Sequence, residues 1–267
     1  MSDSYYEHLF GVRDKVVLIT GGTRGIGLMI AEGMVRCGAN VYIASRKEDA
    51  CRAAEDDLGQ HGKCTAIPSD ISSIDGCQTL ADEIATREGR LDVLINNAGV
   101  TWSEDIDKFS EKAWDKVVDL DAKSPFFLTQ RLLPQLRIAA SPESRAVVIN
   151  VSSVNGIRPS SLRNYSYVVA KAGLQQLSVQ LAQDLNADNI NVNCILPGLI
   201  ATDELKGFGI IPPSEDKDGN PIPRLELTPN PEDVADLALF LASPASDALT
   251  GEQYPIRAWL KSERFWQ

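Results

Sequence analysis

Short apolar runs alternate with longer amphipathic stretches along most of the chain. The runs have the length of strands, and because they are almost wholly apolar they suit strands buried on both faces of a sheet. They occupy Val16–Ile19, Val41–Ala44, Thr65–Pro68, Val93–Asn96, Ala146–Val151 and Asn191–Leu196. Helical spacing marks Gly27–Cys37, Cys51–Gln60, Gly76–Glu88, Glu111–Leu136, Tyr165–Asn186 and Pro231–Leu241. The alternation predicts an α/β protein with a doubly wound parallel sheet and helices on both faces.

One segment interrupts this alternation. Residues 203–231 hold Pro212, Pro213, Pro221, Pro223, Pro229 and Pro231. Proline fixes φ and lacks a backbone donor, so regular structure is hard to sustain there. Long loops of this kind are often functional, and we predict a substrate lid. No repeat and no linker divides the chain, so we expect a single domain over 1–267.

Composition narrows the classes of partner. The net charge of −11 provides no basic footprint, which argues against nucleic acid and an anionic membrane surface as partners. The two histidines and five cysteines form no CxxC pair or other metal-binding spacing, so we expect free thiols and no metal. The N-terminus does not resemble a secretory signal, and no apolar run approaches a membrane span. We therefore expect a cytoplasmic protein that acts on a small molecule.

Glycines lie between the first predicted strand and the helix after it, in Thr20-Gly21-Gly22-Thr23-Arg24-Gly25-Ile26-Gly27. Glycine allows a tight turn and the close approach of backbone to a pyrophosphate, and the helix N-terminus supplies unpaired N–H groups. The position between strand and helix favours a dinucleotide site over an ordinary glycine-rich turn.

The second predicted strand ends in Ser45-Arg46-Lys47, where an NAD-selective site would place a carboxylate for the ribose 2′-hydroxyl. Together with Arg24, these cations suit a 2′-phosphate, because arginine binds phosphate through two parallel hydrogen bonds. The pattern favours NADP (NADPH) over NAD. The alternative is that Arg46 and Lys47 belong to a solvated helix start.

Tyr167 and Lys171 lie four residues apart, so a helix places them on one face. A neighbouring ammonium stabilises a phenolate, which makes tyrosine an acid/base catalyst near neutral pH. Tyr165 lies on a different face. Ser153 follows the fifth predicted strand, where a parallel sheet presents side chains to its ligand crevice. Alone, the pair also fits a solvated helix face, and Ser153 also fits a loop or helix-capping residue.

Taken together, these motifs resemble the short-chain dehydrogenase/reductase family over nearly the whole chain. Within that family, the chain is similar to bacterial and fungal 3-oxoacyl or rhamnolipid-pathway-type ketoreductases. The shared motifs are Thr20-Gly21-x-x-x-Gly25-x-Gly27, Asp70-Ile71, Asn96-Asn97-Ala98-Gly99, Ser153, Tyr167-x-x-x-Lys171 and Pro197-Gly198. The resemblance implies a single Rossmann-type domain and a homo-oligomer, a tetramer or dimer, whose contact surface lies on the helices around Ser124–Leu136 and Tyr165–Asn186.

The resemblance also implies roles for individual residues. Tyr167 would be the acid/base, Lys171 would lower its pKa and hold the nicotinamide ribose, and Ser153 would orient the carbonyl. Asp70 and Ile71 would contact the adenine. The other cofactor contacts would come from Asn97, Gly99, Pro197, Gly198, Ile200, Thr202 and, more weakly, Lys123.

The chain departs from the family pattern at three places. Asp121 stands where the family usually has a catalytic asparagine, so the proton relay is altered, and the carboxylate can pair with Lys171. Ser153 lies fourteen residues before Tyr167, farther than in most members, which leaves Ser152 as an alternative. The usual Asp-Gly-Gly after the last strand is replaced by Tyr254–Leu260.

These observations predict an NADP-dependent oxidoreductase that interconverts a carbonyl and an alcohol on a small or medium organic substrate. Apolar walls for the substrate are expected from Trp102, Phe208, Ile210 and Ile211. Two alternatives stay open. One is an isomerase or dehydratase of the same fold without net redox, to which Asp121 would add an acid/base group. The other is a non-enzymatic NADP-binding module.

Overall fold

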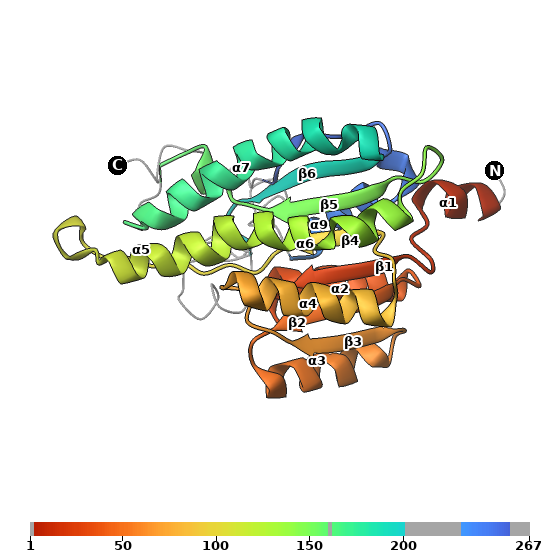
Figure 1. The fold of residues 1–267 in the computed structure, drawn as a ribbon, viewed down its shortest axis with the longest axis horizontal. Coiled ribbons are helices and arrows are strands. Elements are labelled where there is room, and N and C mark those ends of the chain that lie inside the picture. Colours follow the sequence, from red (N-terminus) through yellow and green to blue (C-terminus); the bar gives the residue numbers. More distant parts are fainter. Residues whose placement is uncertain (1–2, 160–161, 201–230, 257–267) are drawn as a thin grey trace, which may run out of the picture.

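The six apolar runs and one further strand form a parallel seven-stranded sheet in the computed structural model, which describes residues 3–159, 162–200 and 231–256 (Figure 1). The strands are β1 (Val16–Thr20), β2 (Asn40–Ser45), β3 (Cys64–Pro68), β4 (Val93–Asn96), β5 (Ala146–Val151), β6 (Ile190–Pro197) and β7 (Gln253–Ile256). Their order is β3-β2-β1-β4-β5-β6-β7, and every neighbouring pair is parallel. The predicted Rossmann-type α/β fold is confirmed.

Helices cover both faces of the sheet. The α-helices are α1 (Asp3–Phe10), α2 (Gly25–Arg36), α3 (Glu48–Gly59), α4 (Ile74–Arg87), α5 (Glu111–Val118), α6 (Ser124–Ala139), α7 (Tyr165–Leu185) and α9 (Pro231–Ala242). Short 3-10 turns lie at η1 (Ile106–Lys108), η3 (Val154–Gly156), η4 (Asn186–Asp188) and η6 (Pro244–Ser246), and η2 (Asp119–Lys123) is π-helical.

Alternation along the strands divides the core into two layers. Val17 and Ile19 of β1 face one cluster, whose helical members come from α2, α3 and α9. Leu18 faces the opposite cluster, which is built with α4, α6 and α7. Figure 1 shows α4, α6 and α7 crossing the front of the sheet. Because successive side chains point to opposite faces, strands that are apolar throughout require helices on both sides.

Three predictions about elements were wrong in detail. The predicted helix Glu111–Leu136 is two α-helices joined by η2, and this π-helical turn carries Asp121 into the interior. Helix α1 was not predicted. The segment from Tyr254 was expected to follow the last strand, but Gln253–Ile256 forms that strand. Pro255 fits there because β7 is an edge strand, where a missing donor costs little.

The topology fixes where a ligand binds. Strands β1 and β4 are neighbours, although β2 and β3 separate them in the sequence. The chain therefore leaves the carboxyl ends of β1 and β4 in opposite directions and opens a crevice between them. Of the predicted lid, residues 203–231, all but the last lie outside the described residues, and Pro231 begins α9. No helix within the described ranges has the length and apolarity needed to cross a membrane.

Candidate active site

A cleft of about 1170 Å³ opens at the carboxyl ends of the strands. Residues from the segments after six of the seven strands line it, in agreement with a crevice at the switch point. The predicted site residues in its wall are Gly21, Thr23, Arg24, Gly25, Ile26, Gly27, Ser45, Arg46, Asp70, Ile71, Asn97, Gly99, Asp121, Ser153, Tyr167, Lys171, Pro197, Gly198 and Ile200. The structure thus brings together residues spread from Gly21 to Ile200.

Two of the predicted cofactor residues that the structure describes are not in this wall. Lys47 is exposed at the start of α3 and is not among the described residues that line the cleft. Lys123 is also exposed outside the wall, with its Nζ 3.0 Å from Asp119 Oδ1. Thr202 lies outside the described residues. The π-helical turn explains why Lys123 is not in the wall, because this turn directs Asp121 into the interior and Lys123 to the surface.

The glycine loop lies against the loop after β4. Gly21 has φ +69°, a region that favours glycine. At Gly27, a Cβ would lie 2.4 Å from Asn97 Nδ2 and 2.4 Å from Gly21 O, so only glycine fits. Helix α2 begins at Gly25 with no acidic side chain in its first turn. Its N-terminal N–H groups and dipole therefore suit an anionic ligand.

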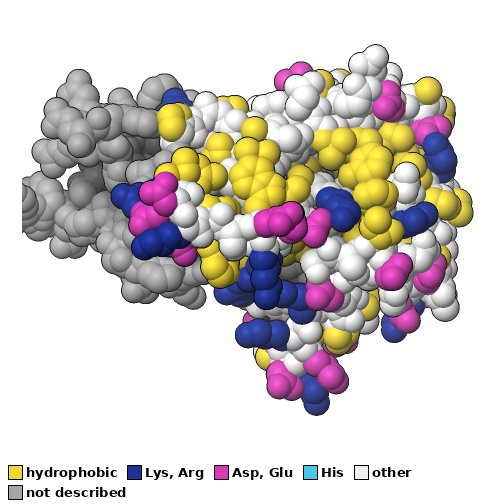
Figure 2. All heavy atoms as spheres, turned by 60° about the vertical axis from the view of Figure 1, so that its left-hand side comes forward, with side chains coloured by type: hydrophobic (Ala, Val, Ile, Leu, Met, Phe, Trp, Pro, Cys, Tyr) yellow, Lys and Arg dark blue, Asp and Glu magenta, His cyan; other side chains and the backbone are white. Residues whose placement is uncertain are grey.

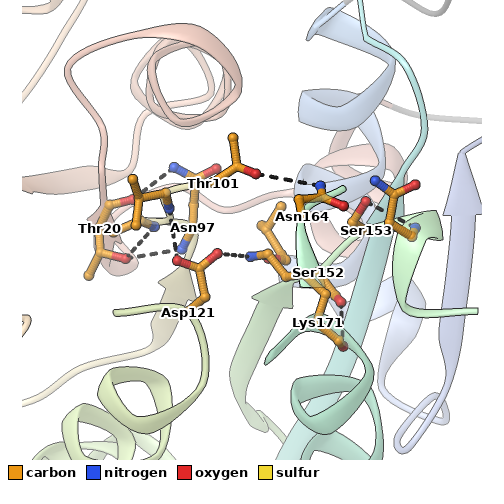
Figure 3. A network of polar contacts seen from close by, with 12 residues as sticks. Thr20, Asn97, Thr101, Asp121, Ser152, Ser153, Asn164 and Lys171 are labelled. Carbon is orange, nitrogen blue, oxygen red and sulfur yellow. Dashed lines mark hydrogen bonds and ion pairs between the residues drawn. The ribbon is translucent and has the colours of Figure 1, made fainter. Parts of the chain in front are cut away.

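Thr20 and Asn97 hold the two loops together (Figure 3). The buried Thr20 hydroxyl accepts hydrogen bonds from the backbone N–H groups of Asn97 and Ala98, each at 3.0 Å. The Asn97 side chain in turn donates to Thr20 O at 2.9 Å. The loops after β1 and β4 therefore form one rigid floor for the cleft.

Two arginines line the cleft beside the glycine loop and the end of β2. Arg46 follows β2, is exposed and lines the cleft together with Arg24 of the glycine loop. Thr23 donates to the Ser45 hydroxyl at 3.2 Å, which joins the glycine loop to the end of β2. An anionic group held at this end would therefore meet two guanidinium groups.

Lys171 lies beneath Tyr167 on α7. The Lys171 Nζ is 5.5 Å from the centre of the Tyr167 ring and donates to Val151 O at 3.1 Å. Lys171 is buried, whereas Tyr167 is half-buried and reaches the cleft. The competing Tyr165 is exposed and packs against Phe109 instead, with 5.5 Å between the ring centres. The helical argument that chose Tyr167 is therefore consistent with the structure.

Ser152 and Ser153 differ in what their hydroxyls contact. Ser152 Oγ donates to Lys171 O at 2.8 Å and accepts from Gln175 Nε2 at 3.0 Å, so it is committed to packing α7 against β5. Within the part of the chain that the structure describes, Ser153 Oγ accepts one hydrogen bond, from Asn155 N at 3.2 Å, and keeps its proton for another acceptor. This difference favours Ser153 as the residue that meets a substrate oxygen.

Asp121 forms a buried ion pair with Lys171. Its Oδ2 lies 3.2 Å from Lys171 Nζ, and its Oδ1 accepts from Val100 N at 2.8 Å (Figure 3). Burial raises the pKa of Asp121, and the nearby ammonium offsets this only in part. Burial works to lower the pKa of Lys171, but Asp121, Tyr167 and Cys194 together outweigh it, so the net pKa is raised. The predicted pairing of Asp121 with Lys171 is present.

Sequence reasoning missed several polar residues around the site. Gln175 is buried and donates a hydrogen bond to Ser153 O, and Thr20 is buried and accepts one from Asn97 N. Glu232 lines the cleft from the start of α9. Trp102, expected as an apolar wall, is outside the lining, with Lys116 Nζ 5.2 Å from its ring centre. The spacing of Gln175, four residues after Lys171, was the one available signal for it.

The sequence matches the short chain dehydrogenase family over residues 15–208. It is 40% identical over 247 residues to the rhamnolipids biosynthesis 3-oxoacyl-[acyl-carrier-protein] reductase of Pseudomonas aeruginosa, which covers 92% of this chain and 96% of that protein. It is 34% identical over 241 residues to the 3-oxoacyl-[acyl-carrier-protein] reductase FabG of Chlamydia muridarum, with 90% and 94% covered.

Solved structures show the same likeness. The Pseudomonas aeruginosa RhlG/NADP active-site complex is similar with a TM-score of 0.85 at 37% identity, covering 95% of this chain and 98% of that one. A 7α-hydroxysteroid dehydrogenase complexed with NADH and 7-oxo glycochenodeoxycholic acid has a TM-score of 0.81 at 28% identity, covering 96% of both chains.

Proposed function

Because the chain belongs to the short-chain dehydrogenase/reductase family, and so is an oxidoreductase of carbonyl and alcohol groups, we propose that it is an NADP(H)-dependent ketoreductase. Its substrate is a small or medium organic carbonyl compound. The single observation that carries this proposal is one cleft that holds Ser153, Tyr167 and Lys171 at one part of its wall and Arg24 and Arg46 at another.

The residues of the cleft fit a dinucleotide phosphate. Gly27 allows the first turn of α2 to pack directly against Asn97 and the Gly21 carbonyl, and this turn presents N–H groups without a competing carboxylate. Arg24 and Arg46 would bind a ribose 2′-phosphate, and Asp70 and Ile71 line the cleft where the adenine would lie. Support for NADP over NAD comes from these two arginines and from the NADP named in the RhlG complex.

Residues of this chain would supply the proton that the reduction of a carbonyl group requires. When bound, NADP(H) supplies or accepts a hydride at its nicotinamide. In reduction, the Tyr167 hydroxyl donates its proton to the carbonyl oxygen that becomes the alcohol, and Ser153 donates a hydrogen bond that orients the same oxygen. Lys171 stabilises the phenolate left behind, because its ammonium lies beside the ring.

Apolar side chains near the catalytic residues define the kind of substrate. Val100, Leu120, Val151 and Ile200 line the cleft with Thr101. Such a wall suits a carbon chain next to the reacting carbonyl better than a fully hydroxylated sugar. The 3-oxoacyl substrates in the names of two relatives support the same class.

One assay tests the proposal. Purified protein is titrated with NADPH and NADH, and nicotinamide absorbance is then followed against ketones, quinones and 3-oxoacyl thioesters. We expect tighter binding of NADPH, and its oxidation by at least one class of ketone. Tyr167→Phe should bind NADPH normally and lose most turnover. Product formation without NADPH oxidation would instead support a non-redox enzyme, and normal turnover in Tyr167→Phe would remove Tyr167 from the mechanism.

We also propose that the protein self-associates through α6 and α7. Figure 2 shows hydrophobic side chains gathered over one face of the molecule. Apolar side chains exposed on α5, α6 and α7 include Trp114, Ile138, Tyr165 and Val169. Light scattering should give the mass of two or more chains, and Val169→Glu should lower it. Ala53→Glu, on the exposed side of α3, is the control.

A further inference from the structure

Helix α7 carries a third polar residue in line with Tyr167 and Lys171. Gln175 follows Lys171 by four residues, as Lys171 follows Tyr167, so the three side chains leave the same face of the helix. Gln175 is buried, with 3% of its surface exposed. A long polar side chain is seldom buried unless its hydrogen bonds are made within the protein.

The Gln175 amide joins α7 to the segment that bears the catalytic serine. Its Nε2 donates to Ser153 O at 2.8 Å and to Ser152 Oγ at 3.0 Å. The Ser152 hydroxyl donates a hydrogen bond to Lys171 O at 2.8 Å. Because Ser153 O can only accept, the amide must direct its N–H₂ group this way, and the orientation of the whole chain of hydrogen bonds is fixed.

We propose that Gln175 is a positioning residue that sets the distance between Ser153 and the Tyr167–Lys171 pair. This inference rests on the proposed function. Tyr167 and Lys171 are held by α7 itself, but Ser153 lies after β5, at the entry to η3. Gln175 connects these two elements directly at the catalytic serine. An error of about 1 Å in the placement of a catalytic group can cost about 100-fold in rate, so this connection bears directly on turnover.

Gly156 shows how closely the two elements approach. A Cβ at Gly156 would lie 2.2 Å from Gln175 Nε2, so the turn after Ser153 lies against this amide. Gly156 N also donates to Ser153 O at 3.0 Å. The Ser153 carbonyl is therefore held from two sides, by its own turn and by α7, and the amide of Gln175 is the hydrogen-bond donor that α7 provides.

Four variants test the proposal. Gln175→Met keeps the length of the side chain and removes the donor, and Gln175→Glu keeps the shape but only accepts when ionised. Gln175→His restores a donor. Gln176→Met, at the exposed next position, is the matched control. We expect kcat to fall about 10- to 100-fold in Gln175→Met and Gln175→Glu, with the Kd of NADPH within twofold, partial recovery in Gln175→His, and no change in Gln176→Met.

A double-mutant cycle shows whether Gln175 acts through Ser153. If it does, Gln175→Met should cost little further activity in a Ser153→Ala background, because the group that it positions is already gone. Equal losses in both backgrounds would overturn the proposal, as would a kcat within twofold of the unaltered enzyme. If Gln175→Met fails to fold, the comparison of Gln175→Glu with Gln175→His decides in the same way.

Amide hydrogen exchange gives a readout that needs no substrate. The Gly156 amide should exchange faster in Gln175→Met than in the unaltered protein, and the Gln176→Met control should not differ. If the unaltered protein reduces no carbonyl compound, the proposed function fails, and unchanged exchange in Gln175→Met would independently overturn the structural part of this inference.

Discussion

Asp121 neutralises Lys171 from inside the protein. The two charged groups are 3.2 Å apart, and the exposed fractions of their side chains are 0% and 5%. Gly99 lies over the pair, since a Cβ there would be 2.9 Å from Asp121 Oδ2 and 3.4 Å from Lys171 Nζ. The charge that would stabilise a Tyr167 phenolate is therefore shared with a carboxylate, at the position where the resemblance to the family leads us to expect an asparagine.

This pairing predicts the pH dependence of Asp121→Asn. Removing the carboxylate leaves the Lys171 charge uncompensated, which favours the deprotonated phenol of Tyr167. Alcohol oxidation needs that base, so its rise with pH should move to lower pH. Profiles of kcat/KM against pH for the two proteins measure the shift. Because burial raises the pKa of Asp121, the profiles should converge once the pH falls below it.

Asp119→Asn is the control for this prediction. Asp119 lies on the same π-helical turn but pairs with the exposed Lys123. Its substitution should leave the profile in place. A profile of Asp121→Asn that matches the unaltered enzyme at every pH would show that the carboxylate does not influence the reacting proton.

Arg46 predicts the choice of cofactor. Arg46→Ala should weaken NADPH binding about 10- to 100-fold, because hydrogen bonds to charged groups contribute about 1.5–3 kcal/mol. NADH binding should change little, since it has no 2′-phosphate. Fluorescence titration with both cofactors measures the difference. The adjacent Lys47→Ala, outside the cleft wall, should bind both as before, and equal losses for NADPH and NADH in Arg46→Ala would contradict the assignment.

Gly27 and Gly33 lie on the same helix and should respond oppositely to alanine. At Gly27 the new Cβ would overlap Asn97 Nδ2 and Gly21 O, whereas at Gly33 the nearest atom is Ala235 Cβ at 3.8 Å. We expect Gly27→Ala to abolish detectable NADPH binding and to lower Tm. Gly33→Ala should bind NADPH normally and gain about 0.5–1 kcal/mol, since alanine is the better helix former. Tolerance at Gly27 would mean that the loops are looser than described.

The sequence predicted six of the seven strands because these are mostly apolar, and each predicted strand lies within or close to the observed one. Gln253–Ile256 was not predicted, because it is only partly apolar. The ends of helices were harder to predict where the hydrophobic periodicity of the sequence and the tertiary contacts favour different structures. The stretch Glu111–Leu136 has continuous helical periodicity, and nothing in that pattern marks the π-helical turn at Asp119–Lys123. An extra residue in one turn changes which side chains face inward, and this is why Asp121 is buried and Lys123 is exposed.

The residues proposed as catalytic could be chosen from the sequence because each has a characteristic spacing or position. The supporting roles of Thr20 and Gln175 could not, since these residues work through contacts between segments 22 to 78 residues apart. Lys47 illustrates the limit. By its position in the sequence, just after β2, Lys47 is as good a candidate to bind phosphate as Arg46, but of these two residues only Arg46 lines the cleft. The sequence places a side chain on an element, whereas packing decides which way it points.

Thr20→Val tests the floor of the cleft. Valine keeps the shape of threonine but leaves the backbone N–H groups of Asn97 and Ala98 without their acceptor at a buried site. We expect a loss of about 2 kcal/mol or more in the free energy of unfolding, measured by urea denaturation. NADPH binding should weaken as well, because Asn97 holds the glycine loop through Thr20 O and Gly21 O.

Thr79→Val provides the matched control on α4. The Thr79 hydroxyl also donates to a backbone carbonyl, Asp75 O at 3.0 Å, but the residue is exposed and water can replace the bond. Its free energy of unfolding should change by less than about 0.5 kcal/mol. If Thr20→Val changes stability no more than Thr79→Val, the two loops are held by other contacts. A loss confined to Thr20→Val would instead mean that one hydroxyl couples the stability of the fold to the shape of the cofactor cleft.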